Sequence, residues 1–314
     1  MASAASRSAS GSTSGGGLAI RRGGVLVAGG DRDPNVRALA VALARRGVPH
    51  HVLEVGQDHH PAVAWDLAAD RLEIDGREAR PAAVFLRHDV FTHLADRRPA
   101  SAHRALAWST TVAAWVDAHP EVRCTNRGGG LRAAPAKPYQ LQQARRAGLA
   151  VPPTLVANHL GAIEAFLPGR PKIVKPVAGG DHTRPLAEAL AAAGTRGAAA
   201  PAPAIVQAEL VPPERRVFAV GGRLHGFTVI SGALDYRTDA ATRVEPWEPV
   251  PDGLAAGLRR LMEALRLDFA AADFKTCPDT GELQFLEVNN GPMFAAFDRA
   301  AGGALTDSLV DFLL

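Results

Sequence analysis

Two oxygen-bearing side chains, Glu287 and Asn289, stand two residues apart in the stretch "FLEVNNGP". Side chains alternate between the two faces of a strand, so both point to one face, while Leu286 and Val288 point to the other, toward a core. Upstream, Asp273 lies in the apolar run "FAAADF", and the intervening "CPDTGE" has the composition of a tight turn. We therefore expect a hairpin that brings Asp273 beside Glu287.

These three side chains offer hard oxygen ligands, with no His or Cys close in sequence. Such a donor set suits Mg²⁺, which takes a few protein ligands and fills its other positions with water and nucleotide phosphates. The pattern predicts a metal site at Asp273, Glu287 and Asn289. An edge strand whose polar side chains face water is the alternative that these residues alone leave open.

Lysine is rare in this chain, because only Lys137, Lys172, Lys175 and Lys275 occur among 35 basic residues. In a chain that prefers arginine so strongly, a retained lysine calls for a physical reason. An ammonium group is a compact point charge, which suits phosphate oxygens. A solvated surface lysine is the alternative.

Composition limits the class of partner. The 35 basic and 32 acidic residues leave a formal net charge of +3, and no basic block with interleaved aromatic residues occurs. Nucleic-acid binding is therefore not expected, and a small molecule or a peptide is the expected partner. At 314 residues with 47% hydrophobic content, the chain is long enough for two domains or a three-lobed unit.

Cysteine and histidine indicate no further metal site. Cys124 and Cys277 are isolated, which argues against a disulfide framework and against zinc. The pairs His50-His51 and His59-His60 have no acidic or cysteine partner at ligand spacing, so we interpret them as solvated loop histidines.

The N-terminal residues 1–22 are interpreted as a flexible Ser/Ala/Gly tail, without the apolar segment of a signal peptide. No apolar run approaches the ~18 residues that a membrane helix needs, so no membrane partner is expected. A cytoplasmic location is the resulting expectation.

Residues 23–130 alternate between strand and helix patterns, which predicts a small α/β lobe with a parallel sheet. Asp33 and Pro34 form a start signal for the first helix, and Asp75-Gly76 predicts a hairpin turn. The first strand-to-helix turn, "AGGDRDPN", lacks the spacing GxGxxG. A dinucleotide-binding dehydrogenase is therefore excluded as the leading interpretation.

The remaining chain divides into two further parts, residues 131–204 and 205–314. The first contains a helix that ends before Gly148 and a strand that carries two lysines, and it closes with a Pro/Ala/Gly linker at 194–204. The second contains strands, an amphipathic helix in "VPDGLAAGLRRLMEALR", the hairpin described above and a C-terminal helix.

Six segments in order, "KPYQLQQARRAGLAVPPT", "KIVKPVAGG", "VQAELV…ERRVFAVGGRLHG", "DYR", "AADF" and "FLEVNNGP", resemble the ATP-grasp ligases. The likeness is to the branch of ribosomal-protein glutamate ligase and the graspetide macrocyclases, and it covers roughly residues 124–298. It implies an α/β chain with α+β lobes: the ATP-grasp fold in a central and a C-terminal subdomain, behind an N-terminal parallel-sheet pre-ATP-grasp domain.

The resemblance implies a nucleotide site. Lys137 and Lys175 match the family lysines that reach nucleotide phosphates. The turn with Gly179, Gly180 and Thr183 would fold over those phosphates through backbone N–H groups. Glu209 and Leu210 match the hinge at which adenine meets the backbone.

It also implies catalytic and metal-binding roles. Arg216 and Arg237 match arginines placed to bind the γ-phosphate, the substrate carboxylate or its acyl phosphate. Glu287 would bridge two Mg²⁺ ions, with Asp273 and Asn289 each holding one and with Mn²⁺ as a substitute.

Two regions depart from the family pattern or lie outside it. The segment after Asn290, "GPMFAAFD", differs from the family sequence, and we expect it to shape the acceptor pocket, with Asp298 as an amine-binding or basic residue. Arg87 and Asp89 end a strand of the N-terminal lobe, where open α/β sheets bind ligands, so they are candidates to hold the substrate carboxylate.

The function that the resemblance implies is an ATP-dependent carboxylate–amine ligase. It would form an amide or peptide bond through an acyl phosphate, releasing ADP and phosphate, in the biosynthesis of a peptide or an amino-acid-derived natural product. A graspetide macrocyclase that links side chains of a ribosomal precursor is the alternative within the family. An ATP-grasp kinase and a non-catalytic nucleotide-binding subunit are alternatives of other classes, and a homodimer is left open.

Overall fold

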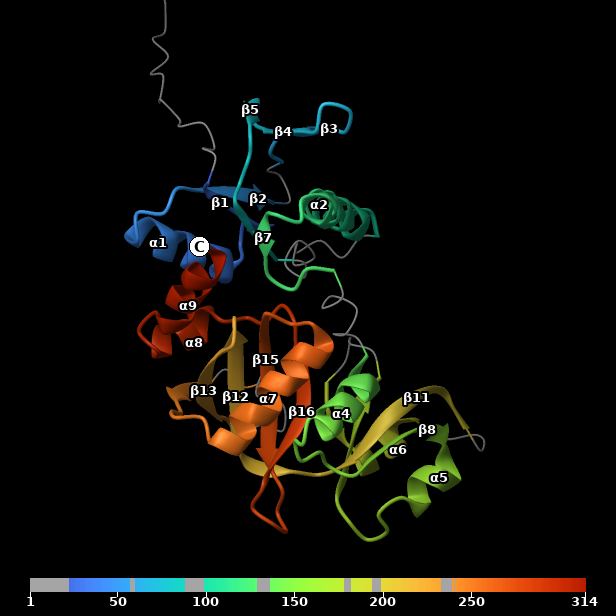
Figure 1. Ribbon diagram of the computed structural model, residues 1–314. Coiled ribbons are helices and arrows are strands. Elements are labelled where there is room, and N and C mark those ends of the chain that lie inside the picture. The colour runs from blue at the N-terminus through green and yellow to red at the C-terminus, as the bar shows by residue number, and fades with distance from the viewer. Residues whose placement is uncertain are drawn as a thin grey trace, which may run out of the picture.

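The computed structural model describes residues 23–56, 60–87, 99–128, 136–177, 182–193, 199–232, 239 and 241–314. The site predictions at Asp89, Gly179, Gly180 and Arg237 lie outside these described residues. The N-terminal lobe lies at the top of Figure 1, a five-stranded sheet lies in the middle, and a smaller sheet lies beside it at the lower right.

The N-terminal lobe contains a parallel sheet with the strand order β2-β1-β6-β7. Its strands are β1 (Val25–Gly30), β2 (His50–Val55), β6 (Ala83–Leu86) and β7 (Arg123–Cys124). A small antiparallel sheet is formed by β3 (Val63–Asp66), β4 (Arg71–Ile74) and β5 (Arg77–Glu78), with the predicted turn between the last two. The predicted α/β lobe is confirmed.

Two helices cover opposite faces of the parallel sheet. Val25 and Val27 of β1 belong to a core with α1 (Pro34–Arg45), whereas Leu26 and Ala28 belong to a core with α2 (Pro99–Ala118). The alternation follows from the two-residue period of a strand. Helix α1 begins as predicted, because the side chain of Asp33 accepts a hydrogen bond from the backbone N–H of Asn35.

The smaller sheet is antiparallel, with the order β10-β9-β11-β8. It is built from β8 (Thr154–His159), β9 (Lys172–Pro176), β10 (Arg184–Pro185) and β11 (Ala199–Ala208), with α5 (Leu160–Ala165) and α6 (Leu186–Ala193). Its separate core includes Ile163, Leu186 and Val206.

Strand β11 corrects the predicted linker at 194–204, because the strand already begins at Ala199, which pairs with His159. The ladder with β8 is interrupted between Ala199 and Ala204. Pro201 and Pro203 lie in that interval and lack the N–H that a regular ladder requires, so a prolyl stretch can still belong to a strand. The strand also runs through the subdomain boundary expected at residue 204.

The five-stranded sheet has the order β14-β13-β12-β15-β16. Its strands are β12 (Val211–Val220), β13 (Arg223–Ile230), β14 (Arg243–Pro246), β15 (Phe269–Thr276) and β16 (Leu283–Asn289). One face packs against α7 (Asp252–Leu265) and α4 (Lys137–Arg146), which lie side by side in front of the sheet in Figure 1. This arrangement leaves the other face for the core of the molecule and for a cavity.

One continuous core joins the N-terminal lobe to that other face. It contains Val25 and Phe85 from the upper sheet, Phe218 from β12, and buried residues of α9 (Ala304–Leu313) such as Leu309. The C-terminal helix therefore packs inside the chain. The short helix α8 (Ala295–Ala300) contributes Phe297 to the same core.

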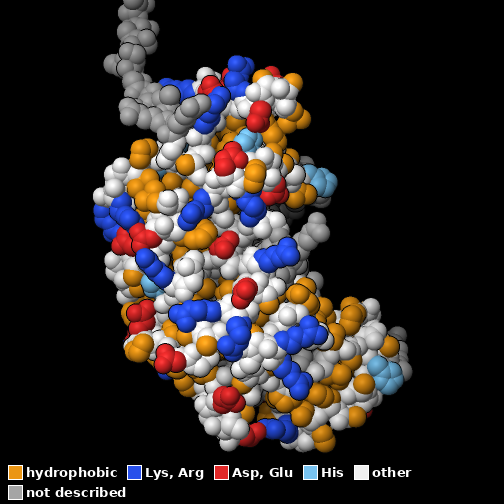
Figure 2. Space-filling view, viewed as in Figure 1, with side chains coloured by type: hydrophobic (Ala, Val, Ile, Leu, Met, Phe, Trp, Pro, Cys, Tyr) orange, Lys and Arg blue, Asp and Glu red, His pale blue; other side chains and the backbone are white. Residues whose placement is uncertain are grey.

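Figure 2 shows basic and acidic side chains that both spread over the face in view, in keeping with the nearly balanced charge of the chain. Among the described residues, no helix is long and apolar enough to span a membrane.

Candidate active site

The predicted hairpin is present, and it brings the two carboxylates together. Strands β15 and β16 are antiparallel neighbours, with Asp273 directly opposite Glu287. The connecting turn is closed by hydrogen bonds from Cys277 N to Glu282 O at 2.8 Å and from Gly281 N to Cys277 O at 2.9 Å. Gly281 has φ +71°, a conformation that glycine adopts without strain.

A bulge in β16 changes which side chains face the site. Asp273 pairs with Glu287, but the next residue, Phe274, pairs with Phe285, so Leu286 is an extra residue in its strand. Because of this insertion, Phe285 and Val288 both face the core, and Leu286, Glu287 and Asn289 line the cavity. The prediction was right for Glu287, Val288 and Asn289 and wrong for Leu286.

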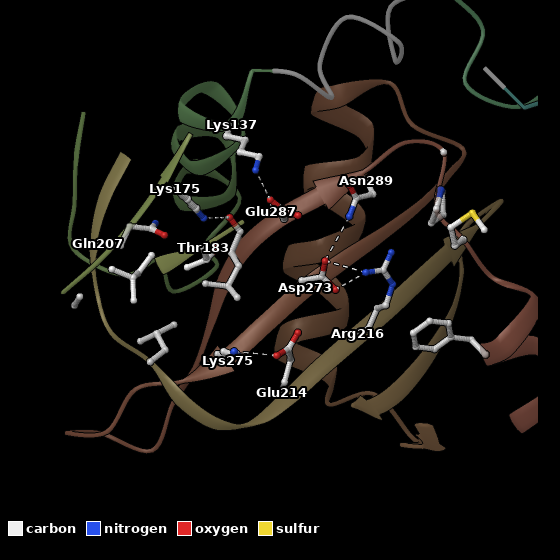
Figure 3. A pocket seen from close by; sticks show the side chains of 18 residues that line it. Lys137, Lys175, Thr183, Gln207, Glu214, Arg216, Asp273, Lys275, Glu287 and Asn289 are labelled. Carbon is white, nitrogen blue, oxygen red and sulfur yellow. Dashed lines mark hydrogen bonds and ion pairs between the residues drawn. The ribbon is translucent and has the colours of Figure 1, made fainter. Parts of the chain in front are cut away.

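A cavity of about 340 Å³ lies between the smaller sheet and the five-stranded sheet. Eight of the predicted site residues line it: Lys137, Lys175, Thr183, Leu210, Arg216, Asp273, Glu287 and Asn289. Figure 3 shows the two lysines approaching from one side and the carboxylates standing on the sheet opposite. Residues that are far apart in sequence thus converge on one space.

The lysines on one side of the cavity meet the acidic side chain of β16. Lys137 Nζ lies 3.0 Å from Glu287 Oε2, and Lys175 Nζ donates to the carbonyl of Leu286 at 3.4 Å. Lys175 is only 6% exposed. Burial lowers the pKa of Lys175 to about 8, and the neighbouring Glu287 carboxylate limits that fall.

Arg216 and Asp273 form a buried ion pair on adjacent strands. Nη1 of Arg216 lies 2.9 and 3.0 Å from the two oxygens of Asp273. The guanidinium also lies 5.4 Å from the ring centres of both Phe218 and Phe297, which fixes its position from the apolar side. Asn289 donates from Nδ2 to Asp273 Oδ2 at 3.4 Å.

The donor set fits a hard cation. It consists of two carboxylates and one amide, and no group of three His, Cys, Asp or Glu side chains gathers anywhere in the described part of the chain. This pattern suits Mg²⁺, which keeps water and phosphate oxygens in several of its positions. The chain's own cations, on Lys137 and Arg216, balance the two carboxylates.

Three residues with polar side chains that line the cavity were not predicted: Gln207, Glu214 and Lys275. Lys275 Nζ lies 3.0 Å from Glu214 Oε2, and both side chains are largely buried. The rarity of lysine was the signal that could have identified Lys275. Three of the four lysines line the cavity, and Lys172 instead donates to the backbone carbonyl of Phe166 at 2.8 Å.

Gln207 offers an acceptor toward a ligand. Its Nε2 donates to Thr154 Oγ1 at 2.8 Å, and that hydroxyl donates to Pro152 O at 2.7 Å, which fixes the orientation of the amide. The carbonyl oxygen Oε1 is buried and has no partner among the described residues. A buried acceptor without a partner is costly, and a ligand that supplies an N–H group would satisfy it.

The predicted hinge lies where β11 ends and β12 begins. Leu210 is buried and lines the cavity, as does Ala208, whereas Glu209 is not among the described lining residues. The backbone N–H of Glu209 donates to Pro171 O at 3.1 Å. Contact of adenine with this backbone remains a prediction.

Arg87 and Asp298 have contacts that differ from their predicted roles, and neither is among the described lining residues. Arg87 is 2% exposed, and its Nε lies 2.9 Å from Asp33 Oδ2. Asp298 is buried and accepts hydrogen bonds from N and Oγ1 of Thr306 at 2.9 and 3.1 Å. These polar groups have partners inside the protein, and a direct contact of either residue with substrate remains a prediction.

Comparison with solved structures identifies the fold. The ATP-grasp ligase PsnB complexed with a minimal precursor is 26% identical, with a TM-score of 0.70, covering 93% of this chain and 99% of its own. The macrocyclase MdnC bound with the precursor peptide MdnA, from Microcystis aeruginosa MRC, is 18% identical, with a TM-score of 0.69, covering 92% of this chain and 98% of its own.

A RiPP-associated ATP-grasp ligase from Chryseobacterium gregarium, in complex with ADP and a leader and core peptide, is 16% identical. Its TM-score is 0.72, and the match covers 93% of this chain and 96% of its own. No family model and no curated protein matches the sequence. The chain is a member of the ATP-grasp superfamily, similar in structure to the branch that contains peptide-modifying ligases.

Proposed function

We propose that this chain is an ADP-forming ATP-grasp ligase that activates a carboxylate of a peptide substrate and joins it to an amine. The observation that carries the proposal is the convergence of Lys137, Lys175, Asp273, Glu287 and Asn289 on one cavity. The likeness to PsnB along nearly the whole chain supports it, because solved complexes of PsnB contain precursor peptides, Mg and ADP.

The chain's own residues bind and orient the reactants. Lys137 and Lys175 bind nucleotide phosphates, and Leu210 and Gln207 surround the base. Arg216, held by two aromatic rings, faces the developing charge. When bound, Mg²⁺ supplies charge neutralisation at the phosphate oxygens, and Asp273, Glu287 and Asn289 would hold it.

The reaction consists of a phosphoryl transfer to the carboxylate and then an acyl transfer to the amine. A carboxylate oxygen attacks the γ-phosphorus of ATP, the bond to the β-phosphate oxygen breaks, and an acyl phosphate and ADP result. A neutral amine then attacks the carbonyl carbon, phosphate leaves, and the amine loses its proton. Holding both partners in one cavity lowers the entropic cost of each step.

Macrocyclisation is the second candidate, and the likeness to MdnC, a macrocyclase bound to its precursor peptide, favours it. In that reaction the activated side-chain carboxylate and the attacking amine or hydroxyl belong to one peptide. A kinase would stop at a stable phosphorylated product, so a requirement for the nucleophile separates it from a ligase.

The proposal includes four further properties of the protein. It binds two Mg²⁺ ions, accepts Mn²⁺ in their place, assembles as a homodimer and is located in the cytoplasm. The roles of Gly179, Gly180 and Arg237 in phosphate and substrate binding belong to it as well. Metal titration with ADP and light scattering of the purified chain check the ion count and the assembly.

The test is product analysis with ATP and Mg²⁺ over candidate peptides, including any short peptide encoded beside this gene. With a candidate amine also supplied, ADP release supports ligation when it accompanies a product one water lighter than the peptide, or one water lighter than the peptide plus the amine, and fragmentation shows whether the new bond closes a ring. AMP release would contradict the acyl-phosphate mechanism. A stable phosphopeptide would establish the kinase alternative, and the variant Glu287→Ala is the matched inactive control.

A further inference from the structure

The carboxyl edge of the parallel sheet is occupied by another part of the same chain. Open α/β sheets usually bind ligands at this edge, which was the reason to predict substrate contacts at Arg87. Arg87 follows β6, Asn126 follows β7, and Asn35 lies at the start of α1. All three side chains instead contact residues 290–295, the segment that follows β16.

These contacts grip the backbone of the segment at four points. Asn126 Nδ2 donates to Asn290 O at 2.7 Å, and Arg87 Nη1 donates to Pro292 O at 2.9 Å. Oδ1 of Asn35 accepts from the N–H groups of Phe294 and Ala295 at 2.7 and 2.8 Å. These four bonds go to the main chain, so they fix the path of the segment, and Asn35 Nδ2 and Arg87 Nη2 also donate to Met293 Sδ at 3.1 and 3.3 Å.

The gripping side chains are themselves held in place. Asn35, Arg87 and Asn126 are 0%, 2% and 4% exposed. The carboxylate of Asp33 lies between two of them, 2.9 Å from Arg87 Nε and 2.5 Å from Asn35 Nδ2. Asn126 also holds the start of β15, since its Oδ1 accepts from Asp268 N and Phe269 N at 2.8 and 2.9 Å. Such a buried network has one low-energy geometry.

The segment continues directly from the predicted metal ligands and forms one wall of the cavity. Asn289 immediately precedes it, and Gly291, Pro292 and Met293 line the cavity. We propose that Asn35, Arg87 and Asn126 are positioning residues, through which the N-terminal lobe sets the geometry of Asn289 and of this wall for binding a nucleotide with its cation. The ligand in this inference rests on the proposed function.

A purely structural role in joining the lobes is the competing explanation, and Arg123 supplies the matched control. Arg123 lies on the next strand of the same sheet, and its Nη1 donates to Phe312 O at 3.0 Å, away from residues 290–295. Arg87→Lys and Arg123→Lys are therefore the same substitution in two lobe-to-lobe contacts. Arg123 is exposed and Arg87 is buried, so their stabilities will differ, but a general joining role predicts that neither variant changes the Mg²⁺-dependent gain in ADP affinity.

The experiment measures calorimetric binding of ADP to the full chain with MgCl₂ and with EDTA, alongside thermal unfolding. We expect Arg87→Lys to reduce the Mg²⁺-dependent gain in ADP affinity by about tenfold, as losses of supporting groups around metal ligands do. We expect ADP binding in EDTA to change little. Arg123→Lys should keep the full gain, and equal gains in the two variants would overturn the inference.

Hydrogen exchange followed by mass spectrometry gives a readout that needs no ligand. In Arg87→Lys the amides within residues 290–295 should exchange faster than in the wild type, and in Arg123→Lys they should not. Asn35→Ala, which removes the acceptor of two of these amides, replaces Arg87→Lys if that variant does not fold. If wild-type protein shows no Mg²⁺-dependent gain, the proposed function fails, and unchanged exchange in 290–295 separately refutes the positioning role.

Discussion

Strands β12 and β15 carry an apolar residue pair and an ionic residue pair on the same face of the sheet. A single cross-strand pair, which faces the other side, separates the two. Phe218 pairs with Ala271, and both lie in the shared aromatic core. Two residues along, Arg216 pairs with Asp273, and both line the cavity. The rigid apolar pair thus positions the ionic pair beside it.

The apolar pair and the ionic pair also contribute differently to the stability and to the function of the protein. Burying an aromatic side chain is a large favourable contribution to folding. Burying an ion pair removes charges from water, so its net contribution to stability is small. We therefore expect substitutions in the apolar half to change mainly the free energy of unfolding, and replacement of both members of the ionic pair by apolar residues to change mainly the activity.

The largest expected effect is on the apolar side. Phe218→Ala should lower the free energy of unfolding by about 3–5 kcal/mol, because it leaves a cavity in a fully buried aromatic cluster. Denaturant unfolding measures the loss, and Phe218→Leu is the control that keeps most of the volume. A loss below about 1 kcal/mol would contradict the assignment of the core.

On the ionic side, Glu287→Ala should reduce ADP formation at least about 100-fold while the protein remains folded. The carboxylate is replaced by a methyl group at the position facing Lys137 and the predicted cation. Steady-state kinetics measures the loss of ADP formation, and circular dichroism checks that the variant is folded. Glu245→Ala, on the exposed edge strand β14, is the matched control, and substantial turnover by Glu287→Ala would remove it from the site.

Lys175 predicts a pH dependence of nucleotide binding. Its pKa is lowered to about 8 by burial, so the protonated form that attracts phosphate is depleted as the pH rises through 8 in the ligand-free protein. ADP affinity should then fall by up to about fivefold from pH 8 to pH 9, as the protonated fraction falls. Lys175→Arg keeps its charge and should flatten the profile, and a profile unaltered by that change would exclude Lys175 as the titrating group.

The lowered pKa of Lys175 has the opposite effect on stability: the free energy of unfolding rises with pH, whereas ADP affinity falls. Between pH 8 and the ordinary lysine value of 10.5, the unfolded chain binds more protons than the folded chain. The contribution of this group to the free energy of unfolding therefore rises over that range and is constant below it. The buried ammonium of Lys175 is thus least favourable to folding at the pH at which it binds phosphate best.

The smallest expected effect tests the packing role of Asp298. Asp298→Ala should cost about 1 kcal/mol of unfolding free energy, because the carboxylate supports the first turn of α9 through Thr306. Activity with any accepted peptide should be unchanged when measured well below the melting temperature. A selective rise in the KM of the amine-bearing substrate would instead support the prediction that Asp298 binds the amine.

The sequence was sufficient to predict the features that depend on residues close together in the chain. The hairpin that joins Asp273 to Glu287 follows from strand alternation and turn composition, and the capping of α1 by Asp33 follows from residue type. The convergence of Lys137 and Lys175 on that hairpin came from the family resemblance and not from spacing. The structure places both lysines at the cavity.

Other features depend on partners that are distant in sequence. The bulge at Leu286 arises from cross-strand register, which alternation within one strand cannot show. Arg87 stands where ligands usually bind, but its partner is the carbonyl of Pro292, 205 residues away. A rule about sheet edges cannot distinguish a substrate from a segment of the same chain.

The continuous core that contains Val25, Phe218 and Leu309 has a mechanical consequence. A shared close-packed interior resists relative displacement, so the N-terminal lobe and the five-stranded sheet should move as one body. The smaller sheet has its own core around Ile163 and Val206 and continues into β12 just after Ala208. We therefore expect a hinge motion of that sheet to admit and release nucleotide, with the pivot between β11 and β12.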